Sequence, residues 1–272
     1  MAIRLLVSDI DGTLVRKDKS LPDANVAAIR AVVAAGCPVS LISARPPSGM
    51  LPIIAALGLE GPFAAFNGGV VFDGSGTLFD AHRLSPRLAG DMAVLFARHE
   101  VMRWLYADGQ WLTNSVDEAH TPREVIAAGI ERTVTERWGD RLHRADKMVA
   151  VSDDDALLTR IEGAARELAG GEATIARSQP YYLDITAKAA NKGDGLAELA
   201  RIAGVPLGDV AVMGDADNDL PMFARAGLSV AMGQSQTWVK TAATFATDAI
   251  MDDAAAAEAV ERYILPRIQN GS

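Results

Sequence analysis

Short apolar segments alternate with helical patterns along both ends of this 272-residue chain. The apolar runs Ile3–Ser8, Pro38–Ser43 and Val210–Met213 have the length of buried strands, and a segment with helical spacing follows each of them. This alternation is typical of βαβ units, which place parallel strands in one sheet with helices on its faces. The sequence therefore predicts an α/β protein built on a parallel sheet.

The pattern changes in the middle of the chain and then returns. Residues 68–80 are glycine-rich and suggest a hairpin, and from about Leu84 to Ile185 the order is helix, two strands, helix, strand, helix, two strands. Ser85 and Ser152 precede two of these helices, where serine is a good N-cap. After Thr186 the first pattern resumes. We therefore predict a Rossmann-like core at residues 1–83 and 186–272, with an α+β domain inserted at 84–185.

Composition narrows the class of partner. The net charge of −9 argues against nucleic acid, because affinity for the phosphate backbone comes from clustered Lys and Arg. No apolar run approaches the ~18 residues that a membrane span needs. Cys37 is the only cysteine, and we expect it to be buried in a protein of the reducing cytoplasm. The sequence leaves open whether the protein is a monomer or a homodimer.

The strongest chemical signal is the segment Asp9-Ile10-Asp11-Gly12-Thr13, which follows an apolar strand directly. In an open α/β sheet, ligands bind at the carboxyl ends of the strands, so this loop lies where a site is expected. Two carboxylates separated by one residue can face a common point, and Gly12 allows a sharp turn after them. An Asx-type turn that only caps backbone amides is the alternative.

A second acidic cluster follows the strand Val210–Met213, with the sequence Gly214-Asp215-Ala216-Asp217-Asn218-Asp219. A calcium-binding EF-hand loop would need glycine at its sixth position and glutamate at its twelfth, where this chain has Leu220 and Ala226. If the two strands are neighbours, the carboxylates of both clusters meet in one crevice. Oxygen ligands alone favour a hard cation such as Mg²⁺, bound together with a substrate phosphate.

Two further residues fit phosphoryl transfer. Ser43 lies at the end of the apolar run Pro38–Ser43, so its hydroxyl and a backbone amide at the end of that strand can face a phosphate. Lys192 begins a helix and can place a positive charge beside the nucleophile and the phosphoryl oxygens.

These segments, in this order, resemble the motifs of the haloacid dehalogenase superfamily, and the whole chain is similar to its Cof-type phosphatase branch. The matching positions are Asp9 to Leu14, Ser43, Lys192 and Gly214 to Asp219, together with Asn67-Gly68-Gly69 and Val230 to Gly233. The segment Ser43-Ala44-Arg45-Pro46 departs from the Thr-Gly-Arg that is common in the branch, although serine keeps the hydroxyl.

The resemblance implies a role for each matching residue. Asp9 would be the nucleophile that forms an aspartyl-phosphate, and Asp11 the general acid and base. Ser43 and Lys192 would hold the phosphoryl group. Further contacts to substrate or phosphate are expected from Gly12, Ala44, Arg45, Asn67 and Asn218. The Mg²⁺ ligands would be the Asp9 side chain, the Asp11 carbonyl and the Asp215 side chain, with Asp219 supporting the water shell.

The resemblance also implies that the inserted domain is a cap that closes over the site and selects the substrate. Hinges are expected near residues 82–84 and 185–188. Two sets of residues in this domain are candidates to line the substrate side, with packing of the cap as the alternative. The first set, on the two middle strands, is Trp104, Tyr106 and Trp111. The second set, near the returning strand, is Arg177, Gln179, Tyr181 and Tyr182.

The residues and the resemblance together predict a Mg²⁺-dependent phosphatase that hydrolyses a small phosphorylated metabolite, such as a sugar phosphate. Two alternatives stay open at this point. One is a phosphotransferase or phosphomutase of the same superfamily, and the other is a non-catalytic module that binds phosphometabolites.

Overall fold

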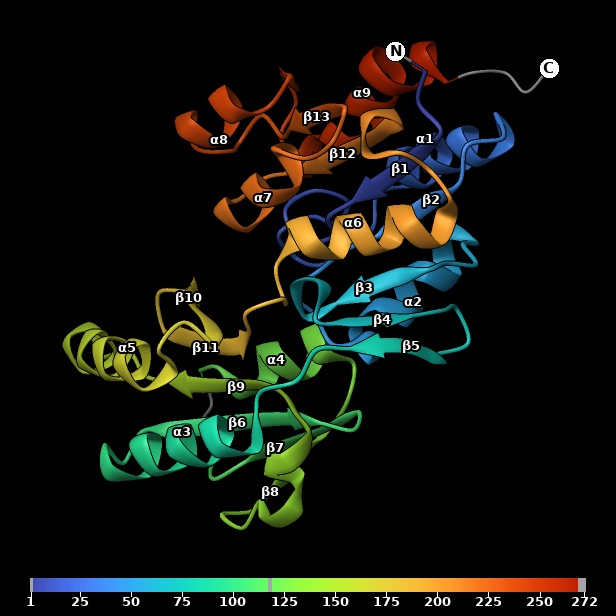
Figure 1. The fold of residues 1–272 in the computed structure, drawn as a ribbon. Coiled ribbons are helices and arrows are strands. Elements are labelled where there is room, and N and C mark those ends of the chain that lie inside the picture. Colours follow the sequence, from blue (N-terminus) through green and yellow to red (C-terminus); the bar gives the residue numbers. More distant parts are fainter. Residues whose placement is uncertain (1, 117–118, 269–272) are drawn as a thin grey trace.

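A computed structural model describes residues 2–116 and 119–268 of the chain. Its first sheet has five parallel strands in the order β14-β13-β12-β1-β2 (Figure 1). The strands span Leu5–Ser8 (β1), Val39–Leu41 (β2), Val210–Gly214 (β12), Leu228–Ala231 (β13) and Phe245–Ala246 (β14). Strands from the two ends of the chain are thus direct neighbours, since β1 pairs with β12. The predicted parallel sheet is confirmed.

Alternation along the strands explains how helices cover both faces of this sheet. Leu6 points into a cluster with helices α1 and α9, whereas Leu5 and Val7 point into another with α6, α7 and α8. Strands buried on both faces read as continuous apolar runs, which is the pattern of the sequence. The helices are Asp23–Ala34 (α1), Lys192–Ala203 (α6), Leu220–Phe223 (α7), Thr237–Ala242 (α8) and Ala255–Ala259 (α9).

A small antiparallel sheet extends this core beyond β2. It has the order β3-β4-β5, with strands Phe63–Ala65, Val70–Phe72 and Leu78–Ala81, and a single parallel bridge from Ile42 to Ala64 links it to the end of β2. The hairpin between β4 and β5 confirms the glycine-rich hairpin expected from the sequence. Helix α2 (Pro47–Leu57) connects β2 to β3.

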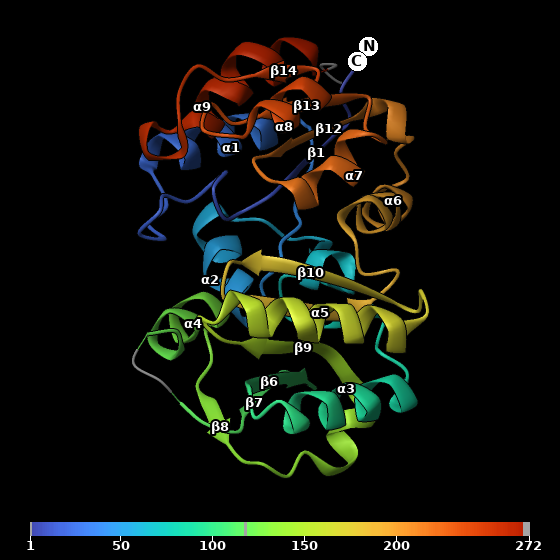
Figure 2. The same ribbon diagram turned by 90° about the vertical axis from the view of Figure 1, so that its left-hand side faces the viewer.

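Residues between the two parts of the core form a six-stranded sheet with the order β10-β11-β9-β6-β7-β8. Helices α3 (Pro86–Arg98) and α5 (Asp155–Ala169) cover one face of it, and α4 (Thr121–Ala128) lies at the other side (Figure 2). We call this six-stranded sheet the cap sheet. Its strands are Met102–Ala107 (β6), Gln110–Thr113 (β7), Arg132–Val134 (β8), Ala145–Val151 (β9), Ala173–Gln179 (β10) and Tyr182–Ala187 (β11).

The cap sheet meets the core through α4 and through one aromatic pair. The hydroxyl of Ser48, in α2, donates to the carbonyl of Ala128, at the end of α4, over 2.6 Å. A Cβ on Gly49 would lie 2.1 Å from the carbonyl oxygen of Ala127, so only glycine permits this approach. The rings of Phe66 and Tyr106 lie 5.6 Å apart. These contacts fix the cap sheet over the edge of the core that carries the loop after β2.

Several details differ from the prediction. The N-cap of α5 is Asp154, whose side chain accepts from the Leu157 amide, and not Ser152. Ser152 instead accepts from the Asp154 amide and supports the turn before the helix. Strands β8 and β14 and helix α8 were not predicted. Within the described residues, no helix has the length and apolar character required to cross a bilayer.

Candidate active site

The two acidic loops meet because their strands are paired. Ser8 at the end of β1 lies opposite Met213 of β12, and the Asp9 amide donates to the Met213 carbonyl over 2.9 Å. Asp9 and Asp215 therefore leave the sheet side by side. The convergence expected from the sequence is a consequence of this register.

Lys192 lies between two of the carboxylates. Its ammonium donates to Asp9 Oδ1 at 2.5 Å and to Asp219 Oδ1 at 2.6 Å, and the lysine is only 1% exposed. The residue before it, Asn191, caps α6 by accepting from the Asp194 amide. This N-cap hydrogen bond fixes the first turn of α6, so Lys192 enters the site from a rigid element.

Burial and neighbouring charges strongly shift the pKa values of Asp9 and Lys192. Burial raises the pKa of Asp9 to about 8, and Asp219 and Asp215 add to the rise, although Lys192 opposes it. Burial alone would lower the pKa of Lys192, but the charges of Asp219 and Asp9 raise it above its usual range. The ammonium is thus the fixed positive charge of the site.

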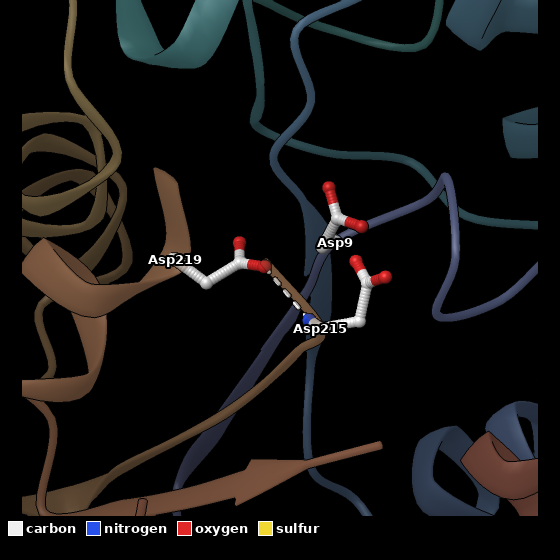
Figure 3. Close-up of side chains that lie close together, drawn as sticks. All are labelled: Asp9, Asp215 and Asp219. Atoms are coloured by element: carbon white, nitrogen blue, oxygen red, sulfur yellow. Dashed lines mark hydrogen bonds between the residues drawn. The ribbon is translucent and has the colours of Figure 1, made fainter. Parts of the chain in front are cut away.

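Backbone amides hold the third carboxylate in place. Asp219 Oδ2 accepts from the amides of Asp215 and Ala216 at 2.8 and 2.9 Å, as the dashed line to Asp215 shows in Figure 3. Asp215 packs against Gly12, where a Cβ would lie 2.2 Å from its Oδ2. Burial, with the charge of Asp219 next, raises the pKa of Asp215 to about 6.

The donor set fits a hard divalent cation. Oxygen atoms of Asp9, Asp215 and Asp219 lie within 4.8 Å of one another. Asp9 Oδ2 is buried and has no hydrogen-bond partner among residues 2–116 and 119–268, so one carboxylate oxygen is left for a ligand. Both oxygens of Asp219 already accept hydrogen bonds, which favours Asp9 and Asp215 as the direct ligands.

Asp11 is held apart from this group by two cations. Arg45 donates to both of its oxygens at 2.6 and 2.7 Å, and Lys19 donates to Oδ1 at 2.7 Å. Burial favours protonation of Asp11, but the hydrogen bonds and charges of Arg45 and Lys19 outweigh it and lower the pKa to about 2. Asp11 is therefore ionised in this arrangement.

The loops after β2 and β3 bring in the remaining expected residues. The Ser43 hydroxyl is buried and accepts from the Arg45 amide at 3.2 Å, with Ala44 between them. The Ser43 amide donates to Ala64, so an amide that faces a phosphate must come from a later residue. Asn67 has a φ of 59° and accepts a 3.1 Å hydrogen bond from Asn218.

Two of the candidates to line the substrate side, Arg177 and Gln179, lie away from the site. Arg177 bonds to Glu162 of α5 and to the Pro180 carbonyl, which places it on the helix-covered side of the cap sheet. Gln179 is exposed at the end of the edge strand β10. Cys37 is buried in the core as expected, and burial raises the pKa of its thiol to about 11.

Two residues near the site were missed from the sequence. Gln234 donates to the Gly12 carbonyl at 2.5 Å and accepts from the Met251 amide. Lys19 reaches Asp11 from the loop before α1. Lys19 lies eight residues after Asp11, and Gln234 directly follows the Val230–Gly233 segment, so closeness to a motif is the only signal that either residue carries in the sequence.

The family model of haloacid dehalogenase-like hydrolases matches residues 6–259. The chain belongs to the haloacid dehalogenase-like hydrolase family. The 5-amino-6-(5-phospho-D-ribitylamino)uracil phosphatase of Bacillus subtilis is 26% identical over 97% of this chain and 96% of its own length. An HMP-PP phosphatase of Cronobacter sakazakii is 29% identical over 85% of each chain.

Solved structures of the family agree with the fold. A haloacid dehalogenase-like hydrolase from Bacteroides thetaiotaomicron superposes with a TM-score of 0.86 at 26% identity, covering 96% of this chain and 99% of that one. The α/β core and its similarity to the family are thereby confirmed, and so is the expectation of a phosphatase of the Cof-type branch that acts on phosphorylated small molecules.

Proposed function

We propose that this enzyme hydrolyses a small phosphate monoester, namely a sugar phosphate. The reaction depends on Mg²⁺ and passes through a phosphorylated Asp9. One observation carries the proposal. The carboxylate of Asp9 is buried between Lys192 and Asp215, and its Oδ2 has no protein partner within the described chain. A carboxylate in this setting is anchored by one oxygen and available through the other, as a nucleophile must be.

The cation would be held by the Asp9 and Asp215 side chains and the Asp11 carbonyl, with Asp219 supporting its water shell. When bound, Mg²⁺ supplies positive charge to the phosphoryl oxygens. Lys192 keeps Asp9 oriented and neutralises charge that grows on the phosphoryl group. The Ser43 hydroxyl would donate a hydrogen bond to that group, and Asn218 and Asn67 would border it.

In the first step Asp9 forms a bond to phosphorus while the bond from phosphorus to the ester oxygen breaks, and Asp11 would give that oxygen a proton. In the second step water attacks phosphorus, its proton returns to Asp11, and Asp9 leaves as a free carboxylate. Asp11 is ionised while Arg45 and Lys19 hold it. We therefore propose that Arg45 turns from Asp11 to the substrate phosphate before the first step, which allows Asp11 to take a proton.

The layout also supports a division of labour between two domains, with residues 1–83 and 186–272 as the catalytic core and 84–185 as a cap that hinges near residues 82–84 and 185–188. The core side carries every carboxylate of the proposed mechanism. Helix α4 of residues 84–185 packs on α2, which begins two residues after Arg45.

Phosphate release from sugar phosphates, nucleotides, cofactor phosphates and p-nitrophenyl phosphate tests the proposal. Wild type and Asp9→Asn are compared with Mg²⁺ and with a chelator. We expect release only by the wild type with Mg²⁺. Activity that survives in Asp9→Asn contradicts the role of Asp9, and transfer to a second sugar faster than to water would identify a phosphotransferase instead.

A further inference from the structure

Lys19 contacts Asp11, the proposed general acid, from the turn that precedes α1. Its ammonium lies 2.7 Å from Asp11 Oδ1. The contact is a hydrogen bond as well as an ion pair, and hydrogen bonds between charged groups are stronger than neutral ones. No step of the proposed mechanism requires this lysine, so the contact needs an explanation of its own.

The backbone of the turn adopts a conformation that is unusual for lysine. Lys19 has a φ of 71°, in the left-handed region where glycine or asparagine is the common residue. The Lys19 amide donates to the Arg16 carbonyl and the Arg16 amide to the Ser20 carbonyl, both over 2.9 Å, which closes the turn. Strained positions of this kind cluster at functional sites. The one side-chain hydrogen bond of Lys19 within the described chain is to Asp11.

Two sets of hydrogen bonds hold the turn in place. Inside it, Asp18 Oδ1 accepts from the amide and the hydroxyl of Ser20 at 2.9 and 2.6 Å. Outside it, Asp252, from the far end of the chain, accepts from the Lys17 amide at 3.2 Å. The ammonium of Lys19 therefore reaches the general acid from a turn that is fixed to another part of the core.

Arg45 and Lys19 bind the two oxygens of Asp11 unequally. Arg45 donates to both oxygens, from Nη2 to Oδ1 and from Nε to Oδ2, whereas Lys19 donates to Oδ1 alone. When Arg45 turns to the substrate phosphate, as proposed above, Oδ2 loses its partner and Oδ1 keeps one. The carboxyl group then has one anchored oxygen, and its free oxygen is the one that had faced Arg45.

We propose that Lys19 is a positioning residue that holds Asp11 Oδ1, so that Oδ2 is the oxygen that transfers the proton; the inference rests on the proposed phosphatase function. In the first step Oδ2 gives its proton to the ester oxygen as the bond from phosphorus to that oxygen breaks. In the second step Oδ2 takes a proton from the water that attacks phosphorus. A carboxyl group anchored by one oxygen meets the leaving oxygen in a fixed orientation, and orientation of this kind lowers the barrier.

Leaving groups of different basicity separate this role from a structural one. A sugar oxygen needs a proton to leave, whereas p-nitrophenolate leaves without one. The steps up to release of this first product determine kcat/KM. The test is therefore kcat/KM for a sugar phosphate divided by kcat/KM for p-nitrophenyl phosphate. We expect Lys19→Met to lower this ratio about tenfold, part of the roughly 100- to 10,000-fold that a general acid contributes.

The second step gives an independent measurement. Asp11 must take a proton from water whatever the leaving group, so Lys19→Met should hydrolyse the aspartyl-phosphate more slowly than the wild type. With p-nitrophenyl phosphate, stopped-flow measurements of this variant should show a burst of about one p-nitrophenolate per enzyme and then slow turnover. A general loss of structure would lower the burst as well.

Two variants serve as controls. Lys17→Met is the matched one, because Lys17 lies in the same turn and, among the described residues, only its backbone amide forms a hydrogen bond. Its ratio should equal that of the wild type. Lys19→Arg keeps a cationic donor at the position and should recover most of the ratio. Since the Lys19 side chain is 41% exposed, we expect its variants to fold.

The inference is overturned if Lys19→Met has the same ratio as Lys17→Met, or if it slows both substrates equally. It is also overturned if Lys19→Arg is as impaired as Lys19→Met. Failure of the phosphatase function looks different, because the wild type would then release phosphate from neither substrate, and that result would overturn both proposals.

Discussion

Gly12→Ala provides a quantitative test of how closely the two acidic loops approach. Gly12 has a φ of +84°, and a Cβ there would lie 2.2 Å from Asp215 Oδ2 and 2.6 Å from its Cγ. Restoring an ordinary contact of about 3.4 Å requires a shift of about 1 Å. A displacement of this size within a catalytic group can reduce the rate about 100-fold. The strained φ alone costs about 1–2 kcal/mol of folding stability.

Gly36→Ala separates the clash from the backbone strain. Gly36 has a φ of +80°, and a Cβ there would meet nothing within 4 Å. Gly36→Ala should lose about 1–2 kcal/mol in urea unfolding, and Gly12→Ala should lose at least as much because the clash adds to the strain. Only Gly12→Ala should lose kcat and need more Mg²⁺ for half-maximal activity. If the two variants have equal activity, Asp215 is not held at the site by its contact with Gly12.

Four further predictions concern the groups whose pKa values or charges are perturbed by burial. Burial raises the pKa of Asp9 to about 8 and that of Asp215 to about 6, so Mg²⁺ must displace protons from these carboxyl groups below those pH values. Calorimetry should therefore show a Mg²⁺ affinity that rises up to about tenfold per pH unit until about pH 8. A Mg²⁺ affinity that does not change with pH would contradict this. The folded-state pKa of Asp9 lies above its ordinary value of 3.8, so its contribution to stability of the metal-free protein falls as pH rises from about 4 to 8. Lys192→Met leaves two buried carboxylates without their cation and should cost about 3–5 kcal/mol in urea unfolding of the metal-free protein; a loss below about 1 kcal/mol would argue against a structural ion pair. The Cys37 thiol, whose pKa burial raises to about 11, should not react with iodoacetamide at pH 8 until the protein unfolds, and Cys37→Ala should keep full activity.

The parts of the fold that the sequence predicts are those whose signal is local. The runs Ile3–Ser8 and Val210–Met213 identify β1 and β12 because strands buried on both faces need consecutive apolar residues. Strand β14 has only two residues, Phe245 and Ala246, and so no periodicity to detect. The N-cap of α5 was misplaced because several residues around Ser152 can cap a helix, and only the backbone path selects Asp154.

The same distinction applies to the site. Asp9, Asp215 and Lys192 could be assigned because each follows or begins a predictable element, and their convergence needs only the β1–β12 pairing. The pairing of Arg45 with Asp11 depends on how the loop after β2 folds back, which no spacing encodes. Whether Trp104 packs the cap or faces the substrate depends on which side of the cap sheet meets the core, and that is a tertiary property.

The most direct test of the central claim is to trap the intermediate. Enzyme with Mg²⁺ and a ³²P-labelled sugar phosphate is quenched in acid within one turnover, and the label is located after tryptic digestion, where Leu5–Arg16 carries Asp9 between the cleavage sites at Arg4 and Arg16. We predict hydroxylamine-sensitive label on that peptide in the wild type and none in Asp9→Asn. Turnover without a labelled peptide, or label that persists in Asp9→Asn, would contradict a covalent intermediate on Asp9.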